Sequence, residues 1–142
     1  FMNIAMGENP ARVVLDTNIL ISAIGFPGKE RQLLILSLSG KIESVTSVVL
    51  LAEFEDVVNK KFPALREELV KTIKKIEKKF IIVSPKVSVS VSRDEDDNRV
   101  LEAAMEGDCD YIITGDKDLL DLGEFKKIKI LRTSEFLDII QL

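Results

Sequence analysis

Short apolar runs alternate with longer stretches of helical periodicity along the chain. Most of these runs are continuous and lack polar alternation, which is typical of strands that are buried on both faces. Strands that alternate with helices favour a parallel sheet with helices on both sides. We therefore expect an α/β fold, a three-layer α/β/α sandwich with a central parallel sheet of about five strands. The predicted strands are RVVLD (12–16), ESVTS (43–47), FIIVS (80–84), YIIT (111–114) and KIKIL (127–131).

Helices are predicted between these strands, and local signals divide them. The dipeptide Phe62-Pro63 ends one helix, because the residue before a proline disfavours helical dihedral angles. The strict alternation of VSVSVS (87–92) predicts an extended, half-exposed segment. Seven helices are predicted. The first begins at Asn18, the second covers 31–40, the third runs from 48 to about Lys60, and the fourth covers 64–79. The fifth follows Arg93, the sixth follows Asp116, and the last covers 134–140.

The length of the chain and its apolar content bound the class of protein. We expect the 142 residues to form a single domain over 1–142, with 1–11 as a flexible N-terminal lead. The best apolar run, LLILSL (33–38), is too short to cross a bilayer, and the N-terminus lacks the pattern of a secretion signal. The single cysteine, Cys109, cannot form an internal disulfide and is expected to be a buried apolar residue. These features predict a cytoplasmic protein.

The absence of histidine restricts the chemistry that the chain can perform. Without histidine there is no Ser–His or Cys–His nucleophile pair and no His-ligated zinc. Carboxylates, lysines, hydroxyls or a bound metal ion must carry any reaction. The net charge of −4 also excludes a protein whose whole surface is basic and binds nucleic acid non-specifically.

Two aspartates stand where predicted strands end. Asp16 closes the first strand, and Asp116 follows YIIT (111–114) by two residues. In open parallel sheets, ligands bind beyond the carboxyl ends of the strands, so both carboxylates are expected near such a crevice. The alternative is that each aspartate only caps the helix that follows it.

A glutamate lies on the core-facing stripe of the helix predicted after residue 47. Glu53 follows Leu50 by three residues and precedes Val57 by four, so periodicity places all three on one face. An acid that faces a core is costly unless it is paired or bound to a metal. The alternative is a glutamate that hydrogen-bonds to a neighbour at the start of the helix.

Periodicity also selects one acid from the acidic segment SRDEDDNRVLEAAMEGD (92–108). Asp97 precedes the inward apolar stripe by three and four residues, whereas Asp96 and Asn98 are expected to point elsewhere and Asp94 to cap the helix. An acidic run is usually a solvated helix start that the helix dipole favours. That alternative accounts for the other acids of the run but not for an acid on the inward face.

Four carboxylates from separate segments would thus meet at one edge of the sheet. Unpaired, they would repel one another and raise each other's pKa values. Mg²⁺ or Mn²⁺ would relieve this repulsion, because these ions prefer oxygen ligands. Such an ion can polarise a phosphoryl oxygen and lower the pKa of an attacking water. The four acids are Asp16, Glu53, Asp97 and Asp116.

Several segments, in their order along the chain, resemble the PIN domain (PilT N-terminus) family and most of all its VapC-like toxin branch. They are VVLDTNILISA, SVVLLAEFEDVV, DEDDNRVLEAA with GDCDYIITGDKDLLDL, and IKILRTSEFLDII. The resemblance runs from about Arg12 to Ile140 and implies a Rossmann-like α/β/α sandwich. It also implies a metal-dependent endoribonuclease that acts on single-stranded or structured RNA.

The resemblance assigns roles to individual residues. The acidic quartet of the family falls on Asp16, Glu53, Asp97 and Asp116, which implies that these residues bind Mg²⁺ or Mn²⁺ and carry catalysis. Within the quartet, Glu53 either holds metal or positions the water. Asp118 would be a fifth acid, and Asn18 and Thr114 would orient a ligand or water; capping and turn roles are the alternative for these three.

The expected partners follow partly from the resemblance and partly from charge. The resemblance implies an RNA substrate, a small antitoxin protein and a homodimer or higher homo-oligomer. A housekeeping RNA-processing nuclease and a non-catalytic scaffold with a vestigial acidic site remain alternatives. Two lysine groups could contact RNA, although a solubilising helix face is the favoured explanation for the first. These groups are Lys71, Lys74, Lys75, Lys78 and Lys79, and Lys117, Lys126, Lys127 and Lys129.

Overall fold

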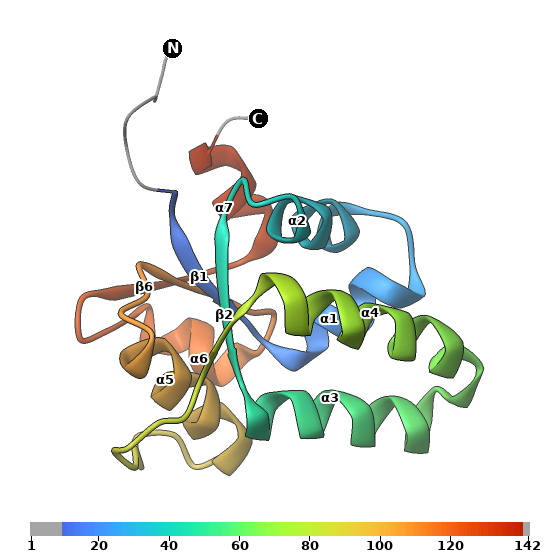
Figure 1. Cartoon of the computed structure of the whole chain (residues 1–142). Coiled ribbons are helices and arrows are strands. Elements are labelled where there is room, and N and C mark those ends of the chain that lie inside the picture. Colours follow the sequence, from blue (N-terminus) through green and yellow to red (C-terminus); the bar gives the residue numbers. More distant parts are fainter. Residues whose placement is uncertain (1–9, 141–142) are drawn as a thin grey trace.

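The central sheet of the computed structural model, which describes residues 10–140, has five parallel strands and one short antiparallel strand (Figure 1). The strand order is β3-β2-β1-β4-β6-β5. Helices cover both faces, as the continuous apolar runs require, so the predicted α/β/α sandwich is confirmed. The strands are β1 (Arg12–Leu15), β2 (Glu43–Ser47), β3 (Ile81–Val83), β4 (Tyr111–Ile113), β5 (Glu124–Phe125) and β6 (Ile128–Leu131).

Alternate residues of the central strands divide the core between the two faces. Val13 and Leu15 pack with one group of helices, while Val14 packs with the other. The first group is α1 (Thr17–Gly25), α2 (Lys29–Leu38), α3 (Val48–Lys61), α4 (Arg66–Lys79) and α7 (Thr133–Ile140); the second is α5 (Glu95–Glu106) and α6 (Lys117–Leu122). The start of α3 also reaches the second group through Leu50.

Two short elements differ from the prediction. The strand β5 pairs antiparallel with β6 across a two-residue turn, Lys126-Lys127, in which both residues have positive φ, 49° and 70°. Such a turn usually carries Asn-Gly, so the sequence shows no hairpin signal here. In addition, the helix predicted over 64–79 is preceded by a 3₁₀ turn at Pro63–Leu65 and begins only at Arg66.

The segment 87–92 is extended but joins no strand of the described sheet. Val87 and Val91 are exposed and Val89 is buried, as an extended, half-exposed segment requires. Side chains of α5 hold it in place. Glu102 accepts a hydrogen bond from the Val89 N–H (2.8 Å), and Asn98 accepts from the N–H groups of Val91 and Ser92.

Several smaller expectations can be compared with the structure. Cys109 is buried as expected, and burial raises the pKa of its thiol to about 12. Of the predicted lead, residues 1–9 lie outside the described residues, while the Ala11 carbonyl accepts a hydrogen bond from the Glu43 N–H (2.9 Å). Among residues 10–140, none of the helices is long and apolar enough to cross a bilayer.

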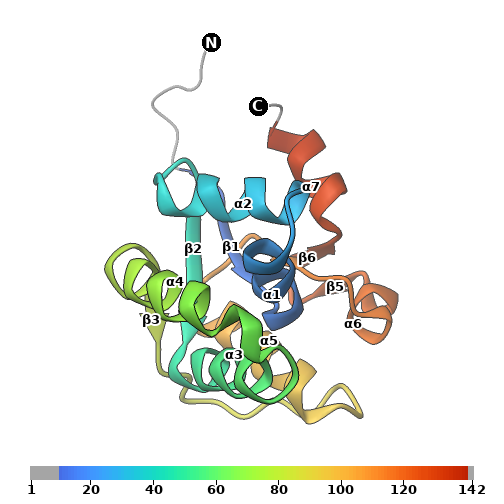
Figure 2. The same cartoon turned by 90° about the vertical axis from the view of Figure 1, so that its right-hand side faces the viewer.

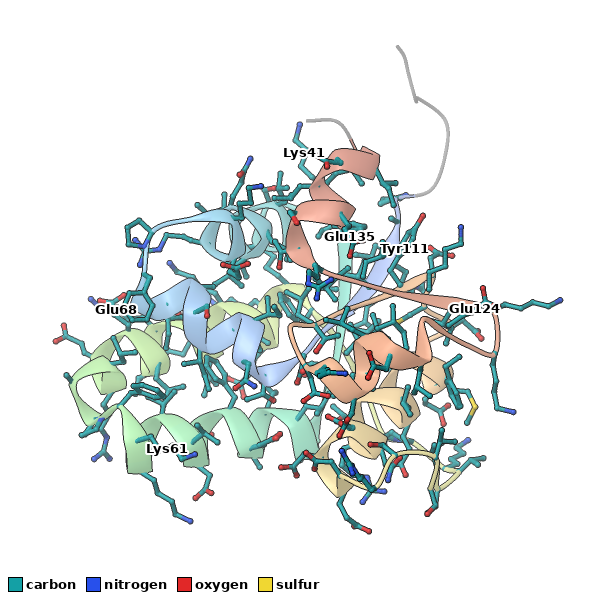
Figure 3. All side chains as sticks on the ribbon, turned by 180° about the vertical axis from the view of Figure 1, so that it is seen from behind. Lys41, Lys61, Glu68, Tyr111, Glu124 and Glu135 are labelled. Carbon is teal, nitrogen blue, oxygen red and sulfur yellow. The ribbon has the colours of Figure 1, made fainter. Side chains whose placement is uncertain are left out.

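The parallel strands bring the starts of several helices to one edge of the sheet. In Figure 2, α1 lies near the centre, with α3 and α5 below it and α6 to its right. At the opposite edge, Tyr111 begins β4 and lies near α7 (Figure 3). Its ring packs edge to face against the ring of Phe136, with 5.4 Å between the ring centroids. Tyr111 thus lies at the amino end of β4, at the other end of the strand from the carboxyl ends of β1 and β4.

Candidate functional site

Asp16 follows β1 and stands at the start of α1, but its side chain does not cap that helix. Its backbone N–H extends the sheet by donating to the Ile113 carbonyl (3.0 Å). Its carboxylate is only 7% exposed and accepts no capping hydrogen bond from α1. The hydroxyl of Thr114 donates to it instead, from Oγ1 to Oδ2 at 2.7 Å. The capping alternative is therefore wrong for Asp16.

Thr114 connects the turn after β1 to the turn after β4. Its side chain is fully buried, and its hydroxyl has two partners. Oγ1 donates to Asp16 and accepts a hydrogen bond from the Asp116 N–H at 2.9 Å. One hydroxyl therefore fixes the relative position of two of the predicted acids.

Asp116 does cap its helix. One of its carboxylate oxygens accepts a hydrogen bond from the Leu119 N–H in the first turn of α6 (3.0 Å). The same carboxylate belongs to a group of acids that we call the three-acid group, Asp97, Asp116 and Asp118. One carboxylate oxygen from each of these residues lies within 4.8 Å of the other two. Asp116 thus combines a structural contact with a place among the converging acids.

Asp97 enters this group from the first turn of α5. It is 5% exposed, and Ser92 donates a hydrogen bond from Oγ to its Oδ2 at 3.2 Å. Asp94 caps α5 by accepting from the Asp96 N–H at 2.9 Å, as predicted. Periodicity therefore distinguished a buried acid from the exposed acids around it.

Glu53 lies beside the three-acid group and not within it. Its side chain is half-buried on α3, and Thr17 donates a hydrogen bond from Oγ1 to its Oε1 at 3.2 Å. Thr17 directly follows Asp16, so the hydrogen bond ties Glu53 to the turn after β1. The structure thus brings together Asp97, Asp116 and Asp118, places Asp16 next to them through Thr114, and leaves Glu53 at the rim.

Three polar neighbours of the acids were missed by the sequence analysis. Thr17 and Ser92 hold Glu53 and Asp97, and Arg93 pairs with Asp118 at 3.4 Å. The sequence indicated their role only weakly: Thr17 directly follows Asp16, and Ser92 and Arg93 begin the acidic segment 92–108.

Three further residues can be compared with their expected positions. Asn98 was expected to point away from the inward face, but it is buried and accepts hydrogen bonds from the N–H groups of Val91 and Ser92. Asn18 is exposed near the start of α1, and its role in orienting a ligand or water stays a prediction. Asp96 is exposed, as expected of a residue off the inward face, yet its charge raises the pKa of Glu53. Asp96 therefore belongs to the electrostatics of the site even though its side chain is exposed.

The pKa values of three acids rise in this environment. Burial raises the pKa of Glu53 to about 7, and the charges of Asp96 and Asp16 add to the effect. Burial also raises the pKa of Asp97 to about 7, together with the charge of Asp116. For Asp16, burial raises the pKa although the Thr114 hydroxyl opposes this. Raised pKa values of clustered carboxylates are typical of functional sites.

The donor set fits a hard divalent cation. The three-acid group and the adjacent Asp16 offer only carboxylate oxygens, and the chain contains no histidine. Oxygen-only sites suit Mg²⁺ and Mn²⁺, whereas zinc sites use nitrogen and sulfur. A cation would also remove the repulsion that now favours protonated carboxyls.

Comparisons with known proteins agree with this architecture. A family model described as "PIN domain" matches residues 12–118, which include every acid described above. The uncharacterized protein MJ1680 of Methanocaldococcus jannaschii is 38% identical over 128 residues, covering 84% of this chain and 80% of that protein. A chain in the crystal structure of VapBC2 from Rickettsia felis bound to a promoter DNA fragment has a TM-score of 0.58. That match has 15% identity over 84% of this chain and 96% of the other, and it shows a shared fold.

Proposed function

Because the chain belongs to the PIN domain family, we propose that it is a Mg²⁺- or Mn²⁺-dependent endoribonuclease that hydrolyses phosphodiester bonds in RNA. The observation that supports this most directly is the meeting of Asp97, Asp116 and Asp118 within 4.8 Å, next to the buried Asp16. Asp16 and Asp97 are buried, and burying acids beside further acids is costly unless a cation or a reaction uses them.

In this proposal, Asp16, Asp97 and Asp116 hold the metal, and Asp118 is a further ligand. When bound, the ion supplies Lewis-acid chemistry: it polarises a phosphoryl oxygen and lowers the pKa of an attacking water. Thr114 and Ser92 keep the carboxylates of Asp16 and Asp97 in place through hydrogen bonds of 2.7 and 3.2 Å. Partners of this kind orient metal ligands.

Glu53 is suited to a different role, because it lies outside the three-acid group. We assign it the task of positioning the attacking water and accepting its proton on a carboxylate oxygen. In the metal-free protein its pKa is raised to about 7, near neutral pH, where a general base works best. The hydrogen bond from Thr17 to Oε1 orients the carboxylate for this task.

The test is RNA cleavage by the purified protein with Mn²⁺, compared with the variant Asp97→Asn. Asp97 is buried in the three-acid group, so the variant should lose nearly all activity. A matched control is Asp56→Asn, which removes the same charge from an exposed side chain that pairs with Lys60 on the surface. Equal cleavage by all three proteins would mean a contaminating nuclease and would favour the non-catalytic scaffold.

We also propose that the enzyme is the toxin of a toxin–antitoxin pair and that a small antitoxin protein neutralises it. The shared fold with a chain of the VapBC2 complex supports this assignment. Expression of the chain alone should arrest growth, and co-expression with its antitoxin, which we expect to be encoded by a short adjacent gene, should restore growth. Unchanged growth with an active nuclease would favour the housekeeping enzyme. A homodimer, also part of this proposal, should show twice the chain mass by light scattering.

A further inference from the structure

A hollow lies where β4 and β6 begin, at the edge of the sheet opposite to Asp16 and Asp116. Its volume of about 510 Å³ is in the range of small-molecule sites. Open parallel sheets usually bind ligands beyond the carboxyl ends of their strands, so this hollow is separate from the acidic site. We call it the lysine pocket, and its lining includes Asp110, Tyr111, Lys126, Lys127, Ile128 and Lys129.

Three lysines make one side of the pocket positively charged. Lys126, Lys127 and Lys129 are exposed, and within residues 10–140 none of them forms an ion pair. The Lys126 ammonium lies 5.8 Å from the centroid of the Phe125 ring, which is a weak contact at an exposed position. In a chain with a net charge of −4, the pocket is a local excess of positive charge. Lysine ammonium groups commonly bind phosphate.

Two of these lysines occupy backbone positions that disfavour them. Lys126 and Lys127 form the turn between β5 and β6 with φ of 49° and 70°, a left-handed conformation that Asn and Gly adopt more readily. The alternative explanation is that lysines protect the edge of the sheet from pairing with another chain. Edge protection needs no lysine at positive φ, because Glu124 is exposed on β5 and already places a charge there. Strained residues cluster at ligand sites, so we attribute these lysines to binding.

The acids near the pocket do not cancel its positive charge. Asp110 lines the pocket, and its Oδ2 accepts a hydrogen bond from the Arg12 backbone N–H at 2.9 Å. Glu124 is the register partner of Lys129 across β5 and β6, but it does not line the pocket. The lining therefore carries three positive charges and one negative charge. Asp110 also keeps a second carboxylate oxygen that can accept a hydrogen bond from a hydroxyl group.

An aromatic ring stands beside the cations. Tyr111 is half-buried, and its ring is held edge to face against Phe136, beside α7 (Figure 3). Lys129 is the register partner of Tyr111 between the parallel strands β6 and β4, so both side chains leave the same face of the sheet. Aromatic side chains stack on flat heterocycles such as nucleobases. The pocket thus presents an aromatic ring and ammonium groups to one ligand.

We infer that the lysine pocket binds a nucleoside phosphate. The three lysines bind the phosphate oxygens, the base packs against the Tyr111 ring, and Asp110 accepts a hydrogen bond from a ribose hydroxyl. A nucleoside diphosphate carries enough negative charge to pair with three ammonium groups, so ADP is a suitable probe. None of the lining residues belongs to the acidic site, and the inference therefore does not depend on the proposed nuclease.

The test is isothermal titration calorimetry of ADP into the whole chain, with a chelator present so that no divalent ion links ADP to the acidic site. We expect one ADP per chain. Lys129→Ala should weaken binding about tenfold, because it removes one hydrogen bond to a charged group. Lys126→Asn/Lys127→Gly should weaken binding about a hundredfold and raise the melting temperature, because Asn-Gly suits this turn. A loss of binding in a more stable variant cannot be attributed to unfolding.

Lys75→Ala/Lys78→Ala is the matched control for the turn variant. Both lysines are exposed on α4 and do not line the pocket, and their removal changes the net charge by the same amount. The control should bind ADP as the native chain does, and so should Asp97→Asn. An equal loss in the control would mean non-specific attraction. A loss in Asp97→Asn alone would place ADP at the acidic site. Either result would overturn the inference.

Inorganic phosphate and adenosine, titrated separately, test the two halves of the ligand. Each should bind at least about tenfold more weakly than ADP, because each uses only part of the pocket. Equal affinity for inorganic phosphate would overturn the nucleoside assignment, and so would no binding of ADP at about 1 mM. A short single-stranded RNA that binds more tightly than ADP and loses affinity in the turn variant would assign the pocket to RNA and overturn the inference.

Discussion

The turns after β1 and β4 both place an aspartate at the start of a helix, yet the two carboxylates are held differently. Asp116 accepts a backbone hydrogen bond from α6 and so stabilises its helix. Asp16 accepts no capping bond from α1; its carboxylate is only 7% exposed and accepts a hydrogen bond from the Thr114 hydroxyl. An aspartate in the same kind of turn therefore caps the following helix at position 116 and does not cap it at position 16.

This difference makes Asp16 stronger evidence for a functional site than Asp116. Asp116 would have a reason to be present even in a protein without a metal site, because it caps a helix. Asp16 is buried, carries a raised pKa and caps nothing, so the fold alone gives little reason for a carboxylate there. A buried acid without a structural task is therefore better evidence for chemistry than an acid that also caps a helix.

The largest expected effect comes from neutralising each aspartate in turn. Asp16→Asn and Asp116→Asn should each lower Mn²⁺-dependent RNA cleavage by more than about 100-fold, the upper end of the loss when a ligand's partner is removed. The two variants should differ in thermal stability. Asp16→Asn should raise the melting temperature of the metal-free protein, because it removes a buried charge. Asp116→Asn should change it less, because α6 loses the favourable charge at its start.

Thermal unfolding at pH 8 in the presence of a chelator checks the second part of this prediction. A lower melting temperature for Asp16→Asn would show that the carboxylate stabilises the fold, and the contrast between the two turns would then disappear.

The link between the turns can be broken at Thr114. Thr114→Val keeps the shape of the side chain but leaves a carboxylate oxygen of Asp16 and the Asp116 N–H without a partner. We expect activity to fall about 10- to 100-fold and the free energy of unfolding to fall by about 1–3 kcal/mol. Thr114→Ser keeps the hydroxyl and is the control for both measurements, by cleavage rate and by urea unfolding. Equal behaviour of the valine and serine variants would contradict the proposed link.

Most of the fold could be predicted from the sequence because its signals are local. The continuous run before Asp16 marks a strand buried on both faces, and Phe62-Pro63 marks the end of a helix; both are properties of neighbouring residues. The hairpin at Lys126-Lys127 was missed because those residues adopt positive φ without the glycine or asparagine that usually signals it.

The candidate site was predictable as a set of positions but not as a geometry. Periodicity can place Asp97 and Glu53 on inward faces, but it cannot give the distance between two helices. Only the structure shows that Asp97 joins Asp118 while Glu53 remains outside that group. The hydroxyl partners of the acids could not be predicted either, because Thr17 and Glu53 are 36 residues apart in sequence and only the fold brings them together.

The raised pKa values predict a dependence on pH that differs with and without metal. Glu53 and Asp97 titrate near pH 7 in the folded protein, well above their ordinary values of 4.5 and 3.8. Between those values and pH 7, the folded state binds more protons than the unfolded state. The metal-free protein should therefore lose stability as the pH rises through this window and change little above it.

Metal binding should show the opposite trend, because the ligands must first lose their protons. The affinity for Mn²⁺ should rise about tenfold between pH 6 and pH 8 for each acid with a pKa near 7 that must be deprotonated. Isothermal titration calorimetry at several pH values measures this slope. Asp97→Asn should flatten the stability profile of the metal-free protein, and an unchanged profile would mean that Asp97 does not titrate in this range.

The smallest effect isolates the capping contact of Asp116. Asn accepts the same backbone hydrogen bond as Asp at the start of a helix, whereas Ala cannot. Asp116→Ala should therefore be less stable than Asp116→Asn by about 1 kcal/mol, measured by urea unfolding of the metal-free proteins. Asp94 offers a control, because it caps α5 through the Asp96 N–H and lies outside the three-acid group. Asp94→Ala and Asp94→Asn should differ by a similar amount. If the Asp116 variants were equally stable, its carboxylate would stabilise α6 no more than Asp16 stabilises α1, and both aspartates would then have only a functional explanation.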